Sequence, residues 1–208
     1  MTFDIIVVGH LGVNCFVLGC EQTGAGVVVD PGADGEEILA LVARRGLKIE
    51  KIINTHGHFD HIGANKLLKD VTGAELLIHD HDLPYLSRAA DAAKMYGLRA
   101  DNSPMPDTLL THGLELTFGE CRMIVIHTPG HTPGGCCLYF PLEGKVITGD
   151  TLFAESVGRT DLPGGSSETL IASIRTKLLP LPEATIVYPG HGQESSIGHE
   201  KRHNPYLA

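Results

Sequence analysis

The chain has 208 residues, of which 42% are hydrophobic, and its net charge is −9 with neutral histidines. This length suits one domain with a large core. The acidic balance, with 16 Lys and Arg residues scattered along the chain, excludes a basic face for nucleic acid. No apolar run approaches the ~18 residues that a membrane span needs. We therefore predict a single domain, 1–208, whose partners include neither nucleic acid nor a membrane.

The five cysteines are odd in number and contain no C-x-x-C pair, so they do not resemble a disulfide framework. We expect each to pack as a small apolar side chain in a reducing compartment. A thiol nucleophile at Cys136 or Cys137 is the alternative use of these residues. Because no basic segment precedes the first apolar run, we expect a cytoplasmic protein.

In the first half of the chain, short β-branched or aromatic runs alternate with helical patterns. The runs predict strands at 5–8, 15–18, 27–29, 49–54 and 76–78. The helical patterns predict helices from a cap at Asp34 to a stop at Gly46, at 64–71, and at 82–97. Residues 98–107 are expected to form a loop in the wall above a site.

The second half again begins with strands, predicted at 114–118, 123–126, 136–140 and 146–147. A helix capped by Ser166 or Ser167 is expected to run through Leu179, followed by a strand at 186–188 and a polar tail. Two strand-rich halves, each closed by helices, suggest two sheets face to face with helices on both outer surfaces.

The segment 55–63, THGHFDHIG, contains three imidazoles and one carboxylate directly after an apolar run. Imidazole nitrogens and carboxylate oxygens are ligands of zinc, iron and manganese. His56 and His58, two residues apart on an extended segment, point the same way, whereas Asp60 and His61 fall on the following turn. This density of ligand-type side chains predicts a metal site.

The same pattern recurs elsewhere, as an apolar strand followed by Gly or Pro and a ligand-type residue. Because side chains just beyond strand ends converge on one edge of a sheet, we expect these residues to meet. Glycine lets the backbone turn and approach closely at such points. The pattern occurs at Asp30, His131, Asp150 and His191.

Two metal ions need about four ligands each, less the positions left to water or substrate. We predict that the first ion is held by His56, His58 and His131. The second is predicted to be held by Asp60, His61 and His191, with Asp150 bridging the two. Zinc is our first choice for both ions, with iron and manganese as alternatives because these donors suit all three metals.

Asp30 has the strand-end position but is not needed as a ligand. One interpretation is that it holds a ligand imidazole from outside the coordination shell. The other is that it forms the turn before Pro31.

The motif at 55–61, with His131, Asp150 and His191 at these intervals, resembles the metallo-β-lactamase superfamily. The resemblance spans the chain from the Asp30 turn to the His191 turn. It implies an α/β fold, the αββα sandwich of two mixed β-sheets with helices on both outer faces. It also implies that Asp60 and Asp150 are catalytic carboxylates.

The segments 158–165, GRTDLPGG, 190–192 and 200–205 are similar to those of the short, bacterial-type glyoxalase II proteins, which are hydroxyacylglutathione hydrolases. The resemblance implies cleavage of a thioester such as S-lactoylglutathione to glutathione and a hydroxy acid. Only residues 192–208 follow His191, so we expect no C-terminal helical domain that carries basic glutathione-binding residues.

The predicted site suggests a mechanism in which a hydroxide between the two ions attacks the thioester carbonyl. A metal lowers the pKa of bound water to about 7, so no separate side-chain base is required. The first ion would take the developing oxyanion, and the second would stabilise the departing thiolate.

Arg159 follows Asp150 on a loop and is our candidate for binding a substrate carboxylate, because a guanidinium pairs with a carboxylate through two bonds. Lys201, with Arg202 beside it, is the candidate from the C-terminal segment. The alternative for these residues is a solvated cation. We expect a small-molecule substrate, an anionic thioester, and the sequence specifies no oligomeric state.

Three other functions stay open. A mononuclear iron persulfide dioxygenase of the same superfamily would use His56, His131 and Asp150 as a facial iron site, although the second ligand set is also complete. A hydrolase of another ester or lactone would use the same ligands. A metal-stabilised binding module would lack turnover, but seven ligands on two ions leave room for solvent and substrate.

Overall fold

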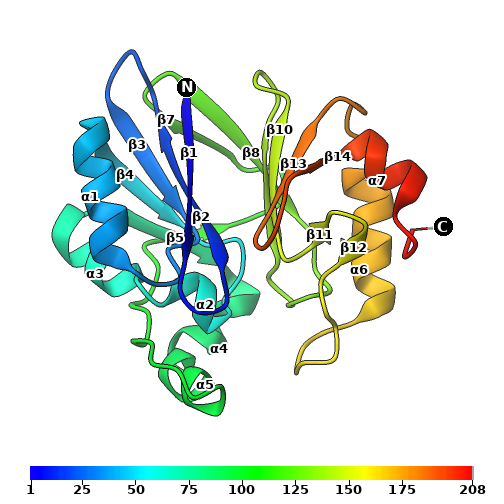
Figure 1. Cartoon of the computed structure of the whole chain (residues 1–208), viewed down its shortest axis with the longest axis horizontal. Helices are drawn as coiled ribbons and strands as arrows, with labels where there is room; N and C mark the ends of the chain where they lie inside the picture. Colours follow the sequence, from blue (N-terminus) through cyan, green and yellow to red (C-terminus); the bar gives the residue numbers. More distant parts are fainter. Residues whose placement is uncertain (208) are drawn as a thin grey trace. The chain divides into compact units, whose positions relative to one another are not determined.

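The computed structural model describes residues 1–207, and the chain divides into two compact units (Figure 1). Met1–Leu110 and Thr117–Arg122 form the N-terminal unit. Thr111–Leu116 and residues 123–207 form the C-terminal unit. That residues 1–208 fold as a single domain stays a prediction.

The N-terminal unit is built on a six-stranded mixed sheet in the order β1-β2-β3-β4-β5-β6. The first two pairs are antiparallel and the remaining three are parallel. The strands are β1 (Thr2–Val8), β2 (Val13–Gly19), β3 (Ala25–Val29), β4 (Lys48–Ile53), β5 (Glu75–His79) and β6 (Thr108–Leu110). Because β3, β4 and β5 are parallel, the segments that follow them leave the sheet at the same edge.

Two helices of this unit, α1 (Gly35–Arg45) and α3 (Asn65–Thr72), cover one face of the sheet (Figure 1). Their apolar side chains, such as Ile38 and Leu68, are buried in one cluster with residues of the strands, such as Val28. The shorter helical elements are α2 (Phe59–Ile62), the 3-10 turn η1 (Asp80–Asp82), α4 (Leu83–Leu86) and α5 (Ala89–Met95).

The C-terminal unit is built on a second mixed sheet in the order β14-β13-β10-β9-β8-β7. In it β10 and β13 are parallel, whereas β9 pairs antiparallel with both β8 and β10. The strands are β7 (Glu115–Phe118), β8 (Cys121–His127), β9 (Cys136–Phe140), β10 (Lys145–Gly149), β13 (Ile186–Pro189) and β14 (Ser195–Ser196). A separate two-stranded ribbon consists of β11 (Leu152–Phe153) and β12 (Ser156–Val157).

Helix α6 (Ser167–Ser173) begins at the predicted cap, since Ser166 Oγ accepts the N–H of Thr169 at 3.3 Å. It continues into a π-helical turn, η2 (Ile174–Leu178). The apolar stripe of this helix packs in the core of the unit, together with the last helix, α7 (Ile197–His203). The buried core residues include Leu170, Ile174, Leu178, Val187 and Ile197.

The predicted fold class, α/β with two mixed sheets and helices, is confirmed. Within residues 1–207, none of the helices has the length and apolar character that crossing a membrane requires.

The single helix predicted at 82–97 is wrong, because α4 and α5 are separate. Pro84 lies in the first turn of α4, where its missing N–H costs nothing. The carboxylate of Asp82 accepts the N–H of Gly57 at 2.8 Å and does not cap the helix. At the break itself, the N–H of Ser103 donates to the carbonyl of Leu86 at 3.0 Å and the N–H of Ala90 donates to Asn102 Oδ1 at 3.0 Å, so contacts with the following loop override the helix propensity of this Ala-rich segment.

The predicted cap at Asp34 is also wrong in its chemistry. Asp34 does precede α1, but its backbone is left-handed, with φ of 51°, and its side chain makes no cap bond. The Asp34 carboxylate instead accepts the N–H of Gly9 at 2.8 Å. The residue thus ties the β1–β2 turn to the start of α1.

The polar tail contains structure that the sequence reading missed. Ser196 Oγ accepts the N–H of His199 at 3.1 Å and so caps α7. The buried Glu200 accepts the N–H of Glu155 at 2.9 Å and the amide of Asn204 at 2.7 Å. These bonds anchor α7 to the β11–β12 ribbon.

Leu170→Ala would remove a fully buried side chain from the core of the C-terminal unit. We expect the free energy of unfolding to fall by about 2–5 kcal/mol, because a cavity replaces the lost contacts. Urea denaturation followed by circular dichroism measures the change. Leu142→Ala, at a side chain that is 79% exposed, is the control and should cost less than ~0.5 kcal/mol. Equal losses in the two variants would contradict the core assignment.

Candidate metal centre

A buried carboxylate stands at the end of β3. Asp30 has a left-handed backbone, with φ of 52°, and is fully buried. Its two oxygens accept the N–H of Thr55 at 2.7 Å and the Thr55 hydroxyl at 2.6 Å, and Oδ2 lies 3.0 Å from Nδ1 of His61. When Nδ1 donates its proton to Asp30, Nε2 of His61 keeps its lone pair for a metal. Of the two interpretations of Asp30, the structure therefore supports the one in which this carboxylate holds a ligand-type imidazole.

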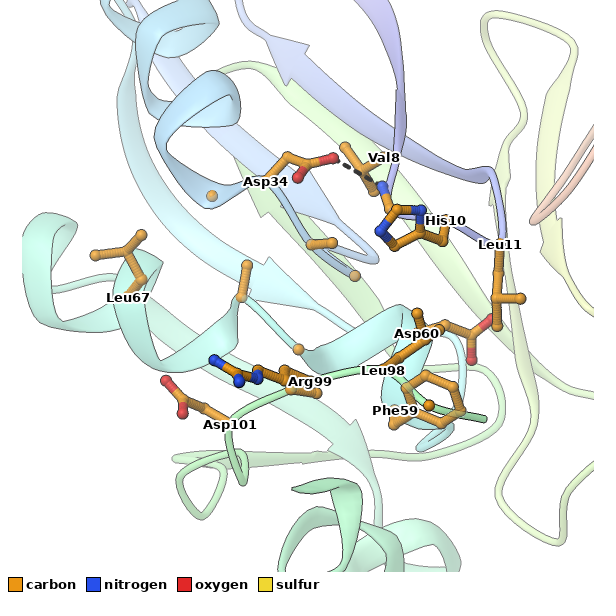
Figure 2. Close-up of a pocket in the computed structure, with 18 residues that line it drawn as sticks. Val8, His10, Leu11, Asp34, Phe59, Asp60, Leu67, Leu98, Arg99 and Asp101 are labelled. Carbon is orange, nitrogen blue, oxygen red and sulfur yellow. Dashed lines mark hydrogen bonds between the residues drawn. The ribbon is translucent and has the colours of Figure 1, made fainter. Parts of the chain in front are cut away.

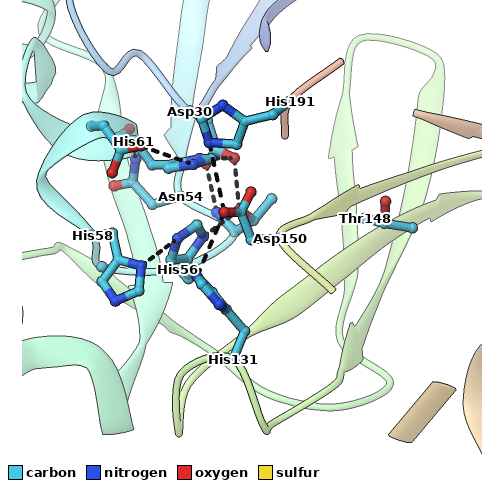
Figure 3. Close-up of polar contacts among 12 residues, drawn as sticks. Asp30, Asn54, His56, His58, His61, His131, Thr148, Asp150 and His191 are labelled. Atoms are coloured by element: carbon cyan, nitrogen blue, oxygen red, sulfur yellow. Dashed lines mark hydrogen bonds and ion pairs between the residues drawn. The ribbon is translucent and has the colours of Figure 1, made fainter. Parts of the chain in front are cut away.

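The segment after β4 brings two further imidazoles together (Figure 3). His56 is buried, and its Nδ1 lies 3.1 Å from the Thr55 hydroxyl. The other ring nitrogen, Nε2, lies 3.1 Å from Nδ1 of His58. Two nitrogens bound to one tetrahedral zinc at about 2.0–2.1 Å are roughly 3.3 Å apart. The observed separation thus fits two ligands of a single ion.

Asp60 and His61 lie on the short helix α2, at the position where the sequence predicts a turn. Nε2 of His61 is 3.8 Å from Oδ2 of Asp60. Ligand atoms that are each about 2.1 Å from one ion are at most roughly 4.2 Å apart. This pair can therefore also share an ion.

Close packing against the loop after Asp30 holds α2 in position. A Cβ at Gly32 would lie 1.5 Å from the carbonyl oxygen of Asp60, so only glycine fits there. The N–H of Ala64 donates to the carbonyl of Pro31 at 2.9 Å, and the amide of Asn54 donates to the carbonyl of His61 at 3.1 Å. The backbone that carries the two ligand-type residues is thus fixed from both sides.

In the C-terminal unit, two ligand-type residues follow the parallel strands β10 and β13. Asp150 comes directly after β10, and His191 follows β13 by one intervening residue. The N–H of Gly190 donates to the carbonyl of Gly149 at 2.8 Å, so the two strand ends stay paired. Parallel pairing therefore brings Asp150 and His191 to the same edge of the sheet.

The third residue of this group, His131, lies in the turn after β8. Its Nδ1 is 2.7 Å from the carbonyl oxygen of Arg159, to which it donates, so Nε2 keeps its lone pair. Glycines allow this approach: a Cβ at Gly158 would lie 1.8 Å from the carbonyl oxygen of Asp150, and one at Gly130 would lie 2.3 Å from the backbone nitrogen of Leu170.

One carboxylate oxygen lies between the two imidazoles of this unit. Oδ2 of Asp150 is 3.6 Å from Nε2 of His131 and 3.6 Å from Nε2 of His191 (Figure 3). Both separations are within the limit for atoms that share an ion. An oxygen at the same distance from two imidazole nitrogens has the position that a carboxylate bridging two ions would need.

The two predicted substrate-binding cations both have carboxylate partners. Arg159 forms a two-bond pair with Asp161, at 2.8 Å for each bond, and this pairing lowers the pKa of Asp161 to about 2. Lys201, on α7, shares Glu183 with Arg202, and the two cations lower the pKa of Glu183. All of these side chains are exposed. A substrate carboxylate would therefore exchange with an existing ion pair.

The sequence reading missed the groups that orient the ligand-type imidazoles. The hydroxyl of Thr55 contacts both Asp30 and His56, and the carbonyl of Arg159 orients His131. The position of Thr55 next to the histidine motif was a signal for the first contact. A backbone carbonyl carries no sequence signal, so the second could not have been found.

The cysteines do not belong to the group of ligand-type residues in either unit. All five are buried and none forms a disulfide within residues 1–207. Burial raises the pKa of the Cys137 thiol to about 11, so this thiol is a poor nucleophile at neutral pH.

Comparisons with known proteins give the family. The model of the Metallo-beta-lactamase superfamily matches residues 8–191, and the chain belongs to this superfamily. The chain is 36% identical over 209 residues to the protein named hydroxyacylglutathione hydrolase GloC of Haemophilus influenzae, a match that covers 100% of this chain and 98% of that protein.

Two crystal structures are similar over nearly the whole chain. The BLEG-1 B3 metallo-beta-lactamase has 39% sequence identity and a TM-score of 0.93, with 100% of both chains covered. The structure of TTHA1623 in a di-iron-bound form has 39% identity and a TM-score of 0.91, covering 98% of this chain and 100% of that one. With the ligand-type groups described above, these matches define a metal-dependent hydrolase of the superfamily.

Asp30→Asn tests whether this carboxylate supports the metal centre. An amide accepts hydrogen bonds at only one of its two ends, so either His61 or the N–H of Thr55 loses its partner, and we expect metal affinity to fall by about 10–100-fold. Competition with a chromogenic chelator measures the affinity. Asp34→Asn is the matched control, because Asp34 also has a left-handed backbone and a carboxylate that accepts a backbone N–H. Unchanged affinity in Asp30→Asn, or an equal loss in Asp34→Asn, would contradict the role of Asp30.

Proposed function

We propose that this hydrolase binds two divalent metal ions and cleaves a small anionic thioester, with S-lactoylglutathione as the first candidate. The observation that carries the proposal is the position of Asp150 Oδ2 between the imidazole nitrogens of His131 and His191. A carboxylate oxygen within ligand distance of both imidazoles can bridge two ions, and the proposal assigns it that role.

The proposed ligand sets combine residues of both units, and the family and the sequence motif support this combination. Within the N-terminal unit, His56 pairs with His58, and Asp60 pairs with His61. A relative of 39% identity has been crystallised in a di-iron-bound form, which supports two ions and makes iron a candidate beside zinc. The proposed first set is His56, His58 and His131, the second is Asp60, His61 and His191, and Asp150 bridges them.

When bound, such ions supply a water molecule of pKa about 7 and a Lewis acid for the thioester carbonyl. The chain itself orients the ligands. Asp30 and the carbonyl of Arg159 hold protons on Nδ1 of His61 and His131, so each Nε2 presents its lone pair. This fixed orientation reduces the reorganisation that metal binding and turnover require.

The thioester substrate is supported by the full-length similarity to the protein named hydroxyacylglutathione hydrolase GloC. A thiolate leaves readily, so a site without a strong general acid suits a thioester better than an amide. Arg159 and Lys201 are the proposed contacts for a substrate carboxylate from the C-terminal unit. To bind the substrate, each side chain would have to break an exposed ion pair, and such a pair contributes only about 0–1 kcal/mol.

The function is tested by thiol release from S-lactoylglutathione, with the protein as purified and after chelation. We expect rapid release that chelation abolishes and that added zinc or iron restores. Release that survives complete metal removal would contradict a metal-dependent mechanism. Oxygen uptake on glutathione persulfide, without thiol release from the thioester, would favour the iron dioxygenase instead.

Arg159→Ala is expected to raise KM for S-lactoylglutathione about tenfold and to change kcat little, because a carboxylate contact made equally in the ground and transition states affects binding alone. Steady-state kinetics measures both constants. Asp161→Asn is the matched variant, since it frees the guanidinium of Arg159 and should leave KM equal or lower. An unchanged KM in Arg159→Ala would remove this residue from the site.

A further inference from the structure

The N-terminal unit contains a cavity of about 870 Å³ that adjoins the ligand-type residue Asp60 (Figure 2). This volume lies in the range of small-molecule sites. Its wall comes from the β1–β2 turn, the loop before α1, helix α2 and the segment after α5. Because Asp60 belongs to both the cavity and the proposed metal centre, a molecule in the cavity can reach the reacting groups.

Next to Asp60, the cavity is lined by apolar side chains. Leu11, Phe59 and Leu98 lie around this part of it, and the ring of Phe59 packs against Tyr96 with centroids 5.4 Å apart (Figure 2). Such a surface excludes water from a methylene or thioether segment of a bound molecule. Figure 2 shows the guanidinium of Arg99 on the other side of the cavity from Asp60.

The carboxylates of the cavity have other electrostatic partners. Asp34 accepts the N–H of Gly9 at 2.8 Å. The charge of Asp101 acts on Lys66, whose pKa is raised mainly by its bond to Asp70 and to a smaller extent by Asp101. Asp60 lies beside His61 in the proposed ligand set. These groups therefore do not supply a carboxylate bond to Arg99.

Arg99 is the one Lys or Arg among the described residues that line this cavity, and it forms no hydrogen bond or ion pair within residues 1–207. Arg159, by contrast, already forms an ion pair with Asp161. A guanidinium with free donors at the edge of a partly apolar cavity is suited to a carboxylate at the end of a short, flexible chain.

We propose that this cavity holds the thiol part of the substrate, and that Arg99 binds a carboxylate at its far end. The inference rests on the proposed thioester hydrolysis and names the class of leaving group, a small thiol with a terminal carboxylate. Glutathione has two carboxylates, so Arg99 and Arg159 need not compete for the same one. The apolar wall beside Asp60 then faces the carbon chain next to the sulfur.

Equilibrium binding tests the inference apart from turnover. The probe is S-methylglutathione, a thioether that cannot be hydrolysed, titrated calorimetrically into the metal-loaded protein. We expect Arg99→Ala to weaken its binding about tenfold and Arg99→Lys to weaken it less, because a lysine keeps the charge but not the two-bond geometry. The S-methyl derivative of N-acetylcysteamine, which has no carboxylate, should bind wild type and Arg99→Ala alike.

Arg44→Ala is the matched control. Arg44 is an exposed arginine in the last turn of α1, whereas the cavity adjoins the first turn of the same helix. Its removal should leave binding of S-methylglutathione unchanged. Equal binding by wild type and Arg99→Ala, an equal loss in Arg44→Ala, or no binding of the probe by wild type would overturn the inference. Loss of binding in Arg99→Ala in a protein that does not cleave S-lactoylglutathione would support the cavity and refute the proposed reaction.

Discussion

The N-terminal part of the site depends on the carboxylate of Asp30. It is fully buried, and burial of a charge is expensive unless hydrogen bonds compensate. Here the backbone and hydroxyl of Thr55 and the imidazole of His61 supply that compensation. The same contacts join the end of β3 to the loop after β4 and to α2. One anion thus fixes the loop geometry and sets which nitrogen of His61 is available to a metal.

The C-terminal unit reaches a comparable result with backbone geometry. The parallel pairing of β10 and β13 brings Asp150 and His191 to one edge, and the carbonyl of Arg159 orients His131. Glycines permit the close contacts: Gly158 packs on the backbone of Asp150, and Gly130 packs on that of Leu170. Both units therefore orient imidazoles through Nδ1, one by a carboxylate and the other by a carbonyl.

The proximity of the ligand-type residues within each unit could be predicted from the sequence, because side chains just beyond strand ends converge. That they hold metal stays a prediction. Strand patterns and the cap at Ser166 were also readable, since they depend on local periodicity and capping chemistry. The break between α4 and α5 and the role of Asp34 were not predicted, because contacts with other segments of the chain decide them. Helix α7 was not predicted either, although its cap at Ser196 is local. The cavity beside Arg99 has no sequence pattern at all, since four separate segments form its wall. The role of Asp30 was predictable only in part. Its position at a strand end left two roles open, and the contacts of its oxygens distinguish an orienting group from a turn residue.

The proposed chemistry depends on two ions that share Asp150 as a ligand. The most direct test is a calorimetric titration of the metal-free protein with zinc, with the bound metal counted by elemental analysis. We expect two equivalents per chain in the wild type, and fewer than two in Asp150→Ala at the same free zinc concentration. A wild-type protein that saturates at one equivalent, or an Asp150→Ala variant that still binds two with unchanged affinity, would contradict this proposal.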